Sequence, residues 1–284
     1  YLCGYHFVVV EMVESRKGVI FVYMQSLSVV IVCKNEAAII GQTLQSLQGL
    51  SDDIIVYDNG STDDTMEIAR RFPVRVYEGA WEGFGQTKNT AIGLAKYDWI
   101  LSLDADEAID DELKNTLLAS SFTDDSMVYE INFKNFFGDK WLKHGEWGND
   151  KHIRLFNRKK VSWNKVPVHE VLVFPDGISV GKLKGSILHY TATDPEKYKS
   201  KLFKYAELNA KKYFEQGKKA GPLKKYAAAF FSLMQNYIFR AGFLDGKAGY
   251  QCAKMSAGYT FLKYSKLSEL NSTDHRNKKQ ATPE

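Results

Sequence analysis

Apolar residues in the first two thirds of the chain form short runs, separated by segments in which apolar positions recur at helical spacing. The runs cover residues 27–33, 53–57 and 99–103, and their length is typical of buried strands. Between the first two runs, one face of a predicted helix carries Ile39, Ile40, Leu44, Leu47 and Leu50. This alternation of strands and helices predicts an α/β fold with a largely parallel sheet.

Acidic side chains follow directly after these apolar runs. Asp104 and Asp106 come after the run 99–103, while Glu36 and Asp58 come after the other two runs. Ligands of open α/β sheets bind just beyond the carboxyl ends of the strands. Two carboxylates one residue apart repel each other unless a cation lies between them, and oxygen ligands suit Mg²⁺ or Mn²⁺. The pattern therefore indicates a metal-diphosphate site, although Asp-x-Asp alone is also common in turns and helix caps.

Four segments, in this order, resemble the nucleotide-sugar half of the family 2 glycosyltransferases, which have the GT-A fold. They read VVIVCKNEAAII, VYDNGSTDDT, GQTKNTAIGLA and WILSLDADE. The likeness spans residues 26–189, and KHIRLFNRKKVSWNKVPVHE and ILHYTATD suggest the bacterial subgroup that adds β-linked glucose to the inner core of lipopolysaccharide. The resemblance implies a GT-A type, Rossmann-like sheet with helices on both faces, a UDP-sugar donor and a lipid-anchored saccharide acceptor.

The resemblance also implies how the donor is held. Asp58 would accept a hydrogen bond from the uracil ring, Glu36 would contact the base or ribose, and Asp104 would contact the ribose or a metal-bound water. Lys88 stands where many relatives carry Arg, so its phosphate or uracil contact would lack the guanidinium fork. Arg154 lies on the polar face of a predicted strand and could meet phosphate. The structural alternatives are a turn residue for Asp58 and an acid favoured by the helix dipole for Glu36.

The same family implies a metal ligand and a base. Asp106 would ligate the divalent cation, Mg²⁺ or Mn²⁺, that helps the nucleoside diphosphate leave, and His189 is either a further ligand or a structural residue. Transfer with inversion needs a base for the acceptor hydroxyl. Glu170 is the first candidate and Asp150 the second; alternatively, Glu170 is a solvated strand residue beside a structural His169.

Composition fits a soluble enzyme with one large domain and an appendage. The chain has 284 residues, of which 44% are hydrophobic and 25% charged. It contains no run of eighteen apolar residues, so a membrane span is not expected. The three cysteines, Cys3, Cys33 and Cys252, are far apart and suggest neither a disulfide framework nor a metal site, which favours the cytosol.

Charge is divided unevenly along the chain. Residues 195–284 hold 18 Lys and Arg against 7 Asp and Glu, a net charge of +11, which leaves a net charge of −7 for residues 1–194. Apolar residues of this basic part recur at helical spacing: Leu223, Tyr226, Ala227, Phe230, Phe231, Met234, Tyr237, Ile238 and Ala241. The pattern predicts a helix lying in the headgroup layer of an anionic membrane. The alternatives are a stripe that packs on its own domain and a nucleic-acid surface; with sugar-transfer motifs upstream, we expect no nucleic acid.

Four regions are predicted. Residues 1–24 form an extension that is foreign to the natural protein or disordered, or else an extra β-hairpin; residues 25–194 form the transferase domain. Residues 195–270 form a basic helical region close to the membrane and acceptor, and residues 271–284 a disordered tail. The hypothesis is an inverting, metal-dependent glycosyltransferase at the inner face of the cytoplasmic membrane that acts on a lipopolysaccharide core. The alternatives are a transferase for another polyprenyl-linked or surface glycan, and a catalytically silent nucleotide-sugar-binding module; the oligomeric state is left open.

Overall fold

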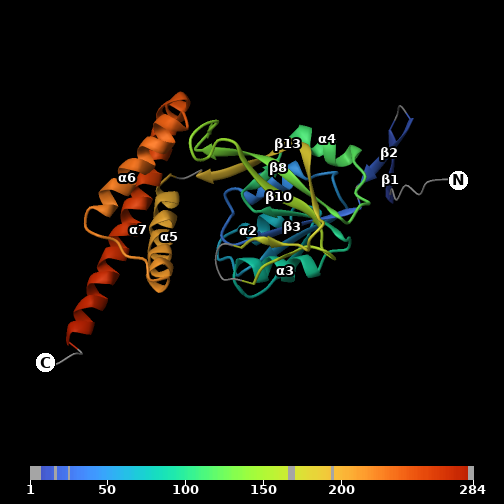
Figure 1. The fold of residues 1–284 in the computed structure, drawn as a ribbon. Helices are drawn as coiled ribbons and strands as arrows, with labels where there is room; N and C mark the ends of the chain where they lie inside the picture. Colours follow the sequence, from blue (N-terminus) through green and yellow to red (C-terminus); the bar gives the residue numbers. More distant parts are fainter. Residues whose placement is uncertain (1–7, 16–17, 25, 166–169, 193–194, 281–284) are drawn as a thin grey trace. The chain divides into compact units, whose positions relative to one another are not determined.

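The computed structural model describes residues 8–280 except 16–17, 25, 166–169 and 193–194 (Figure 1). The chain divides into two compact units. The first unit comprises Tyr1–Phe133 and Lys151–His189, and the second comprises Lys134–Asp150 and Tyr190–Glu284. The boundary predicted at residue 195 therefore lies close to Tyr190, but the segment Lys134–Asp150, which was expected to belong to the transferase domain, joins the helical unit.

One mixed sheet organises the first unit. Its strand order is β5-β4-β3-β6-β10-β8-β13-β7, and β9 pairs with β8. The strands are β3 (Leu27–Cys33), β4 (Asp53–Asp58), β5 (Arg75–Glu78), β6 (Trp99–Asp104), β7 (Glu107–Ile109), β8 (Met127–Phe137), β9 (Lys140–Trp141), β10 (Asp150–Asn157) and β13 (Ser179–Ala192). The strands from β5 to β6 are parallel, whereas β10 pairs antiparallel with β6 and β13 with β7. The predicted α/β class with a mostly parallel sheet is confirmed.

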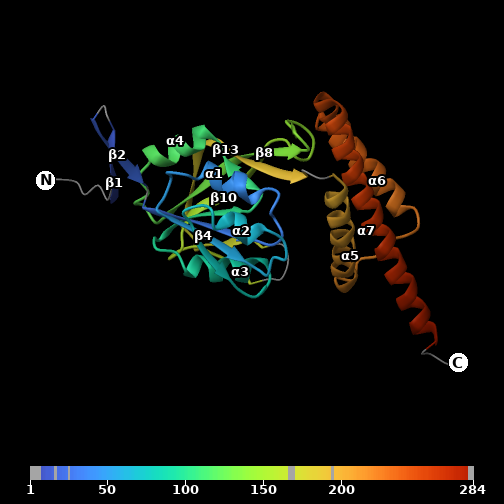
Figure 2. The ribbon, with the colours of Figure 1, turned by 180° about the vertical axis from the view of Figure 1, so that it is seen from behind.

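Helices cover both faces of this sheet (Figures 1 and 2). Successive side chains of a strand point to opposite faces, so each central strand packs against helices on both sides. Val29 and Ile31 pack into one buried cluster with α1, α2 and α4, whereas Val30 packs into another cluster with α3. The helices are α1 (Ile40–Ser46), α2 (Thr65–Ala69), α3 (Phe84–Gly93) and α4 (Asp111–Ala119). The apolar face predicted for the first helix is confirmed, since its five residues are all buried: Ile39, Ile40, Leu44, Leu47 and Leu50.

Two small hairpins complete the first unit. β1 (Val8–Ser15) pairs antiparallel with β2 (Gly18–Met24), which is the form that the alternative expectation of an extra hairpin describes. β11 (Ser162–Trp163) pairs antiparallel with β12 (Leu172–Val173). His169, predicted to be a structural neighbour of Glu170, lies outside the described residues.

Helices dominate the second unit, as predicted for the C-terminal region. They are α5 (Pro195–Glu215), α6 (Lys224–Met234), the π-helical turn η1 (Gln235–Phe239), the 3-10 turn η2 (Gly242–Asp245) and α7 (Gly246–Gln280). The segment from residue 271, for which the sequence predicts disorder, lies in α7 up to Gln280 in the structure. None of the helices in the described part of the chain is long and apolar enough to cross a membrane.

Candidate functional site

The parallel strands bring two predicted acidic residues to one edge of the sheet. In the register of β3 with its neighbours, Cys33 lies opposite Asp58 of β4, and Val32 lies opposite Asp104 of β6. Asp58 is only 2% exposed. Its Oδ2 accepts hydrogen bonds from the backbone N–H groups of Gly60 at 2.9 Å and Ser61 at 2.8 Å. Asp58 thus orders its own turn, as the structural alternative predicted, and a uracil contact would add to that role.

The loop after β3 is tied to the loop after β4. The Asn35 side-chain oxygen accepts a hydrogen bond from the Thr62 N–H at 2.7 Å, with Asn35 in the left-handed conformation (φ 56°). The Glu36 N–H donates to Thr65 Oγ1 at 2.8 Å. These bonds fix the backbone that carries Glu36 at the same sheet edge as Asp58.

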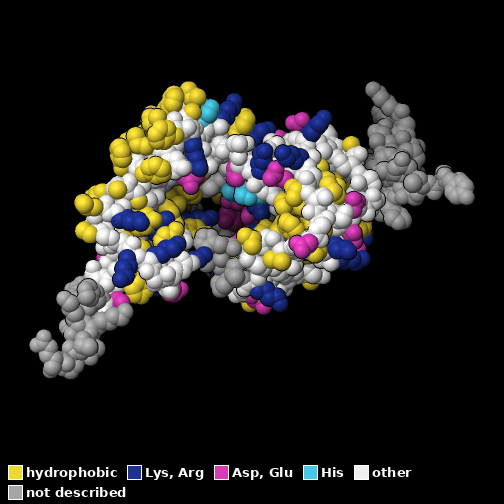
Figure 3. All heavy atoms as spheres, viewed as in Figure 1, with side chains coloured by type: hydrophobic (Ala, Val, Ile, Leu, Met, Phe, Trp, Pro, Cys, Tyr) yellow, Lys and Arg dark blue, Asp and Glu magenta, His cyan; other side chains and the backbone are white. Residues whose placement is uncertain are grey.

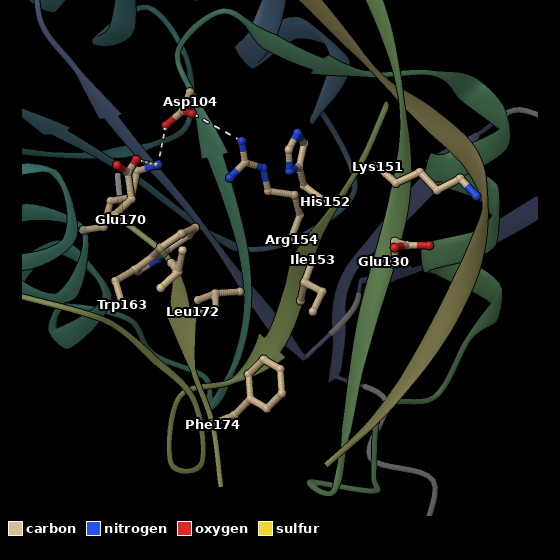
Figure 4. Close-up of a pocket in the computed structure, with 12 residues that line it drawn as sticks. Asp104, Glu130, Lys151, His152, Ile153, Arg154, Trp163, Glu170, Leu172 and Phe174 are labelled. Carbon is tan, nitrogen blue, oxygen red and sulfur yellow. Dashed lines mark hydrogen bonds and ion pairs between the residues drawn. The ribbon is translucent and has the colours of Figure 1, made fainter. Parts of the chain in front are cut away.

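A pocket of about 490 Å³ lies in the first unit (Figure 4). This volume falls in the range of roughly 300–1,000 Å³ found for ligand sites. Four predicted site residues line it together: Lys88, Asp104, Arg154 and Glu170. In Figure 4, Asp104, Arg154 and Glu170 lie at one end of the pocket, and the apolar side chains of Ile153, Leu172 and Phe174 lie toward the other.

Lys88 is the central cation of the charged end. The side chain projects from α3 and is only 4% exposed. Its Nζ lies 2.9 Å from Asp104 Oδ1 and 3.4 Å from Glu170 Oε1, and 4.6 Å from the ring centroid of Trp163. The ammonium group therefore joins the proposed donor-binding carboxylate to the proposed base, over the face of an indole ring.

Arg154 forms a second cationic contact with Asp104. Its Nη2 lies 3.3 Å from Asp104 Oδ2 and also donates to Glu107 Oε1 at 2.5 Å. Glu107 is fully buried, and its Oε2 accepts a hydrogen bond from the Asp104 N–H at 3.0 Å. Burial raises the pKa of Glu107, and Arg154 opposes that rise. Burial acts in the same direction on Asp104, but the charges of Lys88 and Arg154 outweigh it and lower the pKa of Asp104.

Asp106 and His189 lie together beside Glu107. Asp106 Oδ2 is 3.6 Å from His189 Nε2, and β13 places His189 opposite Glu107 of β7. Burial lowers the pKa of His189, but the hydrogen bond and charge of Asp106 outweigh that effect and raise it. Within the described part of the chain, no group of three or more His, Cys, Asp or Glu side chains is arranged to hold a metal ion. The pair still fits a Mg²⁺ or Mn²⁺ site in which diphosphate oxygens and waters supply the other ligands.

Asp150 is placed differently. It belongs to the second unit, where its Oδ2 accepts a hydrogen bond from Asn135 Nδ2 at 3.0 Å and where it lines another pocket. Glu170 lines the pocket that contains Lys88 and Asp104. The two candidate bases therefore line different pockets, and Glu170 is the one that shares a pocket with Lys88 and Asp104.

Two residues of the site were not predicted. Glu107 follows Asp106 directly, and its position as the third acidic residue within the four residues 104–107 at the strand end was the available signal. Trp163 lies under Lys88, and its backbone exchanges hydrogen bonds with the Asn89 side chain at 2.8 and 2.9 Å, which ties β11 to α3. A single Trp in a polar segment gives no signal of this kind in the sequence.

The chain matches one family model and is similar to several glycosyltransferases. The model of the family described as glycosyl transferase family 2 matches residues 28–169. A protein of Rickettsia typhi named as an uncharacterized glycosyltransferase is 30% identical over 258 residues, which cover 87% of this chain and 88% of that protein. The lipopolysaccharide core biosynthesis glycosyltransferase LpsC of Rhizobium meliloti is 28% identical over 251 residues, covering 85% of this chain and 91% of that protein.

Among solved structures, one similar chain is the glucosyl-3-phosphoglycerate synthase of Mycobacterium tuberculosis, crystallised with Mn²⁺, UDP and glucosyl-3-phosphoglycerate. The likeness covers 39% of this chain and 43% of that chain, at 26% identity and a TM-score of 0.29. Because that score is low, the likeness supports no conclusion about the site.

Proposed function

Because this chain belongs to glycosyl transferase family 2, we propose that it transfers glucose from UDP-glucose to a membrane-anchored saccharide, with inversion and with help from Mg²⁺ or Mn²⁺. The observation that carries the proposal is the joint placement of Lys88, Asp104, Arg154 and Glu170 around one pocket at the carboxyl end of a parallel sheet. The chain is a glycosyltransferase by family. Its donor, acceptor and cation are the proposed parts.

The reaction assigns a different task to each side chain. Glu170 takes the proton from the acceptor hydroxyl while that oxygen forms a bond to the anomeric carbon, and the bond from this carbon to the diphosphate oxygen breaks. Lys88 and Arg154 donate hydrogen bonds to the diphosphate, where charge develops as UDP leaves. Asp58 and Glu36 hold the uridine. Asp106 and His189 would hold the cation, which supplies Lewis-acid stabilisation of the leaving group.

Two classes of saccharide fit the proposed acceptor. The name of the relative LpsC supports a lipopolysaccharide core intermediate. Another polyprenyl-linked or surface glycan is the alternative with the same chemistry. A catalytically silent module would have no need for Glu170 beside Lys88 and Asp104, and their contacts argue against that reading.

Release of UDP from several sugar nucleotides tests the donor and cation. The expected result is turnover of UDP-glucose with Mn²⁺ or Mg²⁺, and loss of that turnover in Asp106→Asn together with weaker cation-dependent UDP binding in calorimetry. Asp111→Asn, the same change at an exposed position in the first turn of α4, is the matched control. A folded Asp106→Asn variant with unchanged UDP affinity and activity would remove Asp106 from the cation site.

The base is tested by a pair of variants. Glu170→Gln is expected to keep UDP binding and to lose roughly 10²- to 10⁴-fold in turnover, the usual contribution of a general base. Asp150→Asn is expected to retain more turnover than that. If the two variants show the opposite pattern, Asp150 is the base and Glu170 is not.

We also propose that the second unit binds the anionic inner face of the cytoplasmic membrane. The residues of the predicted stripe are mostly outside any core, and further apolar side chains on the turns after α6 join them. Side chains exposed by 46% or more include Leu223, Tyr226, Phe230, Phe231, Ile238, Phe239, Phe243 and Leu244. In Figure 3 hydrophobic side chains gather on this unit with Lys and Arg beside them. Packing of the stripe onto its own domain would have buried these rings, so their exposure supports an interfacial role.

Flotation with vesicles tests the membrane proposal. Each lysine near an anionic surface contributes about 1 kcal/mol, so Lys224→Glu/Lys225→Glu should weaken binding to anionic vesicles by at least roughly 30-fold. The control is Lys182→Glu/Lys184→Glu, the same change at two exposed positions of β13 in the first unit. The proposal would be contradicted if the protein bound neither anionic nor neutral vesicles, or bound both equally. Tight, strongly salt-dependent binding of oligonucleotides would favour the nucleic-acid alternative.

A further inference from the structure

The second unit contains a pocket of its own, of about 450 Å³. Its lining comes from the segment between β9 and β10, from the first residue of β10 and from Arg240, which follows η1: Lys143, His144, Gly145, Glu146, Gly148, Asn149, Asp150 and Arg240. The volume again falls in the range of roughly 300–1,000 Å³ that ligand sites occupy. All the lining residues belong to one compact unit.

The backbone around this pocket has unusual conformations. Among the described residues other than glycine, positive φ angles occur at Asn35, Asn149 (57°) and Ala241 (55°), and the last two belong to or adjoin this pocket. An alanine in the left-handed region costs roughly 1–3 kcal/mol and persists only where the surroundings hold it. Arg240, the residue before Ala241, directly follows the π-helical turn η1, and such turns are frequent at functional sites.

A buried carboxylate holds the lining segment in place. Asp245 is 6% exposed, and its Oδ2 accepts hydrogen bonds from the N–H groups of Lys143 at 3.0 Å and His144 at 2.8 Å. Its Oδ1 lies 3.1 Å from His144 Nδ1. The Gly145 N–H donates to the Arg240 carbonyl oxygen at 2.9 Å. A Cβ at Gly148 would lie 2.3 Å from the Lys143 carbonyl oxygen, so only glycine fits at this position without a shift of the backbone. The pocket wall is therefore rigid and preformed.

The chemistry of the lining selects a class of ligand. Lys143 and Arg240 are cationic donors, Glu146 and Asp150 are anionic acceptors, and Asn149 has both a donor and an acceptor. The described lining has no aliphatic side chain and no Phe, Tyr or Trp, which disfavours a lipid tail. The presence of both charge signs disfavours a polyanion. Sugar hydroxyls both donate and accept hydrogen bonds, so a ring that carries several of them matches this mixture of groups.

We propose that this pocket binds a sugar unit of the acceptor oligosaccharide, other than the one that receives glucose. The inference rests on the proposed function, because it assumes a saccharide acceptor. Arg240 and Lys143 donate to ring and hydroxyl oxygens, while Glu146 and Asp150 accept from hydroxyl groups.

Saturation-transfer NMR with the full chain and a neutral hexose oligosaccharide released from a lipopolysaccharide core tests the inference. The wild type is expected to saturate oligosaccharide protons. Arg240→Gln and Lys143→Gln are each expected to weaken the affinity at least tenfold, and to raise the KM for the acceptor more than the KM for UDP-glucose. Lys254→Gln removes the same charge at an exposed position of α7 that does not line the pocket, and it should leave both quantities unchanged.

The outcomes separate this inference from the proposed function. The inference is overturned if the wild type does not bind the oligosaccharide, if both pocket variants bind it as well as the wild type, or if inorganic phosphate displaces it competitively, which would make the pocket an anion site. If UDP is still released from UDP-glucose in those cases, the proposed donor chemistry stands. If no UDP is released but pocket-dependent oligosaccharide binding is observed, the inference stands and the proposed reaction fails.

Discussion

Removing Arg154 should destabilise the first unit strongly, because its partner Glu107 cannot reach water. Arg154 is 9% exposed and Glu107 is fully buried. Arg154→Met keeps much of the side-chain volume but leaves Glu107 as a buried carboxylate that has lost its counter-ion. Breaking a buried ion pair in this way costs about 3–5 kcal/mol. In Arg154→Met/Glu107→Gln neither charge remains, and the cost should fall by roughly 2 kcal/mol or more.

Native-state hydrogen exchange of the β6 amides measures this cost in the first unit alone, without the two-state assumption that a chain of two units does not satisfy. Arg70→Met is the matched control, since Arg70 pairs with Glu78 at 3.1 Å and both side chains are more than half exposed. Its effect should stay within about 1 kcal/mol.

The destabilisation caused by Arg154→Met should change with pH in a defined direction. The pKa of Glu107 is raised in the folded protein, so the stability linked to its protonated form is present at low pH and is lost as pH rises through the folded pKa. Loss of Arg154 raises that pKa further, so the destabilisation should be larger at about pH 8 than at about pH 5. A cost of less than about 1 kcal/mol for Arg154→Met would contradict the assigned role of the buried ion pair between Arg154 and Glu107. A double variant that is no more stable than the single one would contradict it as well.

Three further changes probe the surroundings of the site and the core. Gly85→Ala would place a Cβ 1.9 Å from the Asn164 carbonyl oxygen, so it should cost about 1–3 kcal/mol in chemical unfolding, whereas Gly93→Ala, whose Cβ meets nothing within 4 Å, should not. Lys88→Gln should weaken UDP binding in calorimetry by about 1.5 kcal/mol or more, roughly tenfold, and an unchanged affinity would exclude a phosphate contact. Burial raises the pKa of the Cys252 thiol to about 12, so mass spectrometry should find it unalkylated at about pH 8.5 until the protein is unfolded.

The sequence allowed prediction of the parts of the fold whose signal is local. β3, β4 and β6 are apolar runs, and α1 has the helical spacing of buried residues, so pattern alone identified them. The family predicted from four short motifs is confirmed by the match over residues 28–169. Polar composition alone did not indicate that α7 extends to Gln280, because a helix that is already nucleated by packing can continue through residues with little apolar surface.

The parts that were missed depend on contacts between distant residues. Arg154 reaches Glu107 only because β10 pairs antiparallel with β6, with Leu155 opposite Leu101, and no periodicity in the sequence encodes that register. The second pocket depends on Asp245, which binds backbone groups about one hundred positions earlier in the chain. Such a residue looks like an ordinary turn acid until the fold brings its partners to it.

The charge around Asp104 indicates why donor and cation should depend on each other. Asp104, Asp106, Glu107 and Glu170 are acidic, and the fixed cations in contact with Asp104 are Lys88 and Arg154. A diphosphate that entered alone would add negative charge beside these carboxylates and would compete with them for the two cations. A divalent cation held by Asp106 and His189 would offset that charge. Thermodynamic linkage requires the effect to be reciprocal, so the cation should strengthen UDP binding by the same factor by which UDP strengthens cation binding.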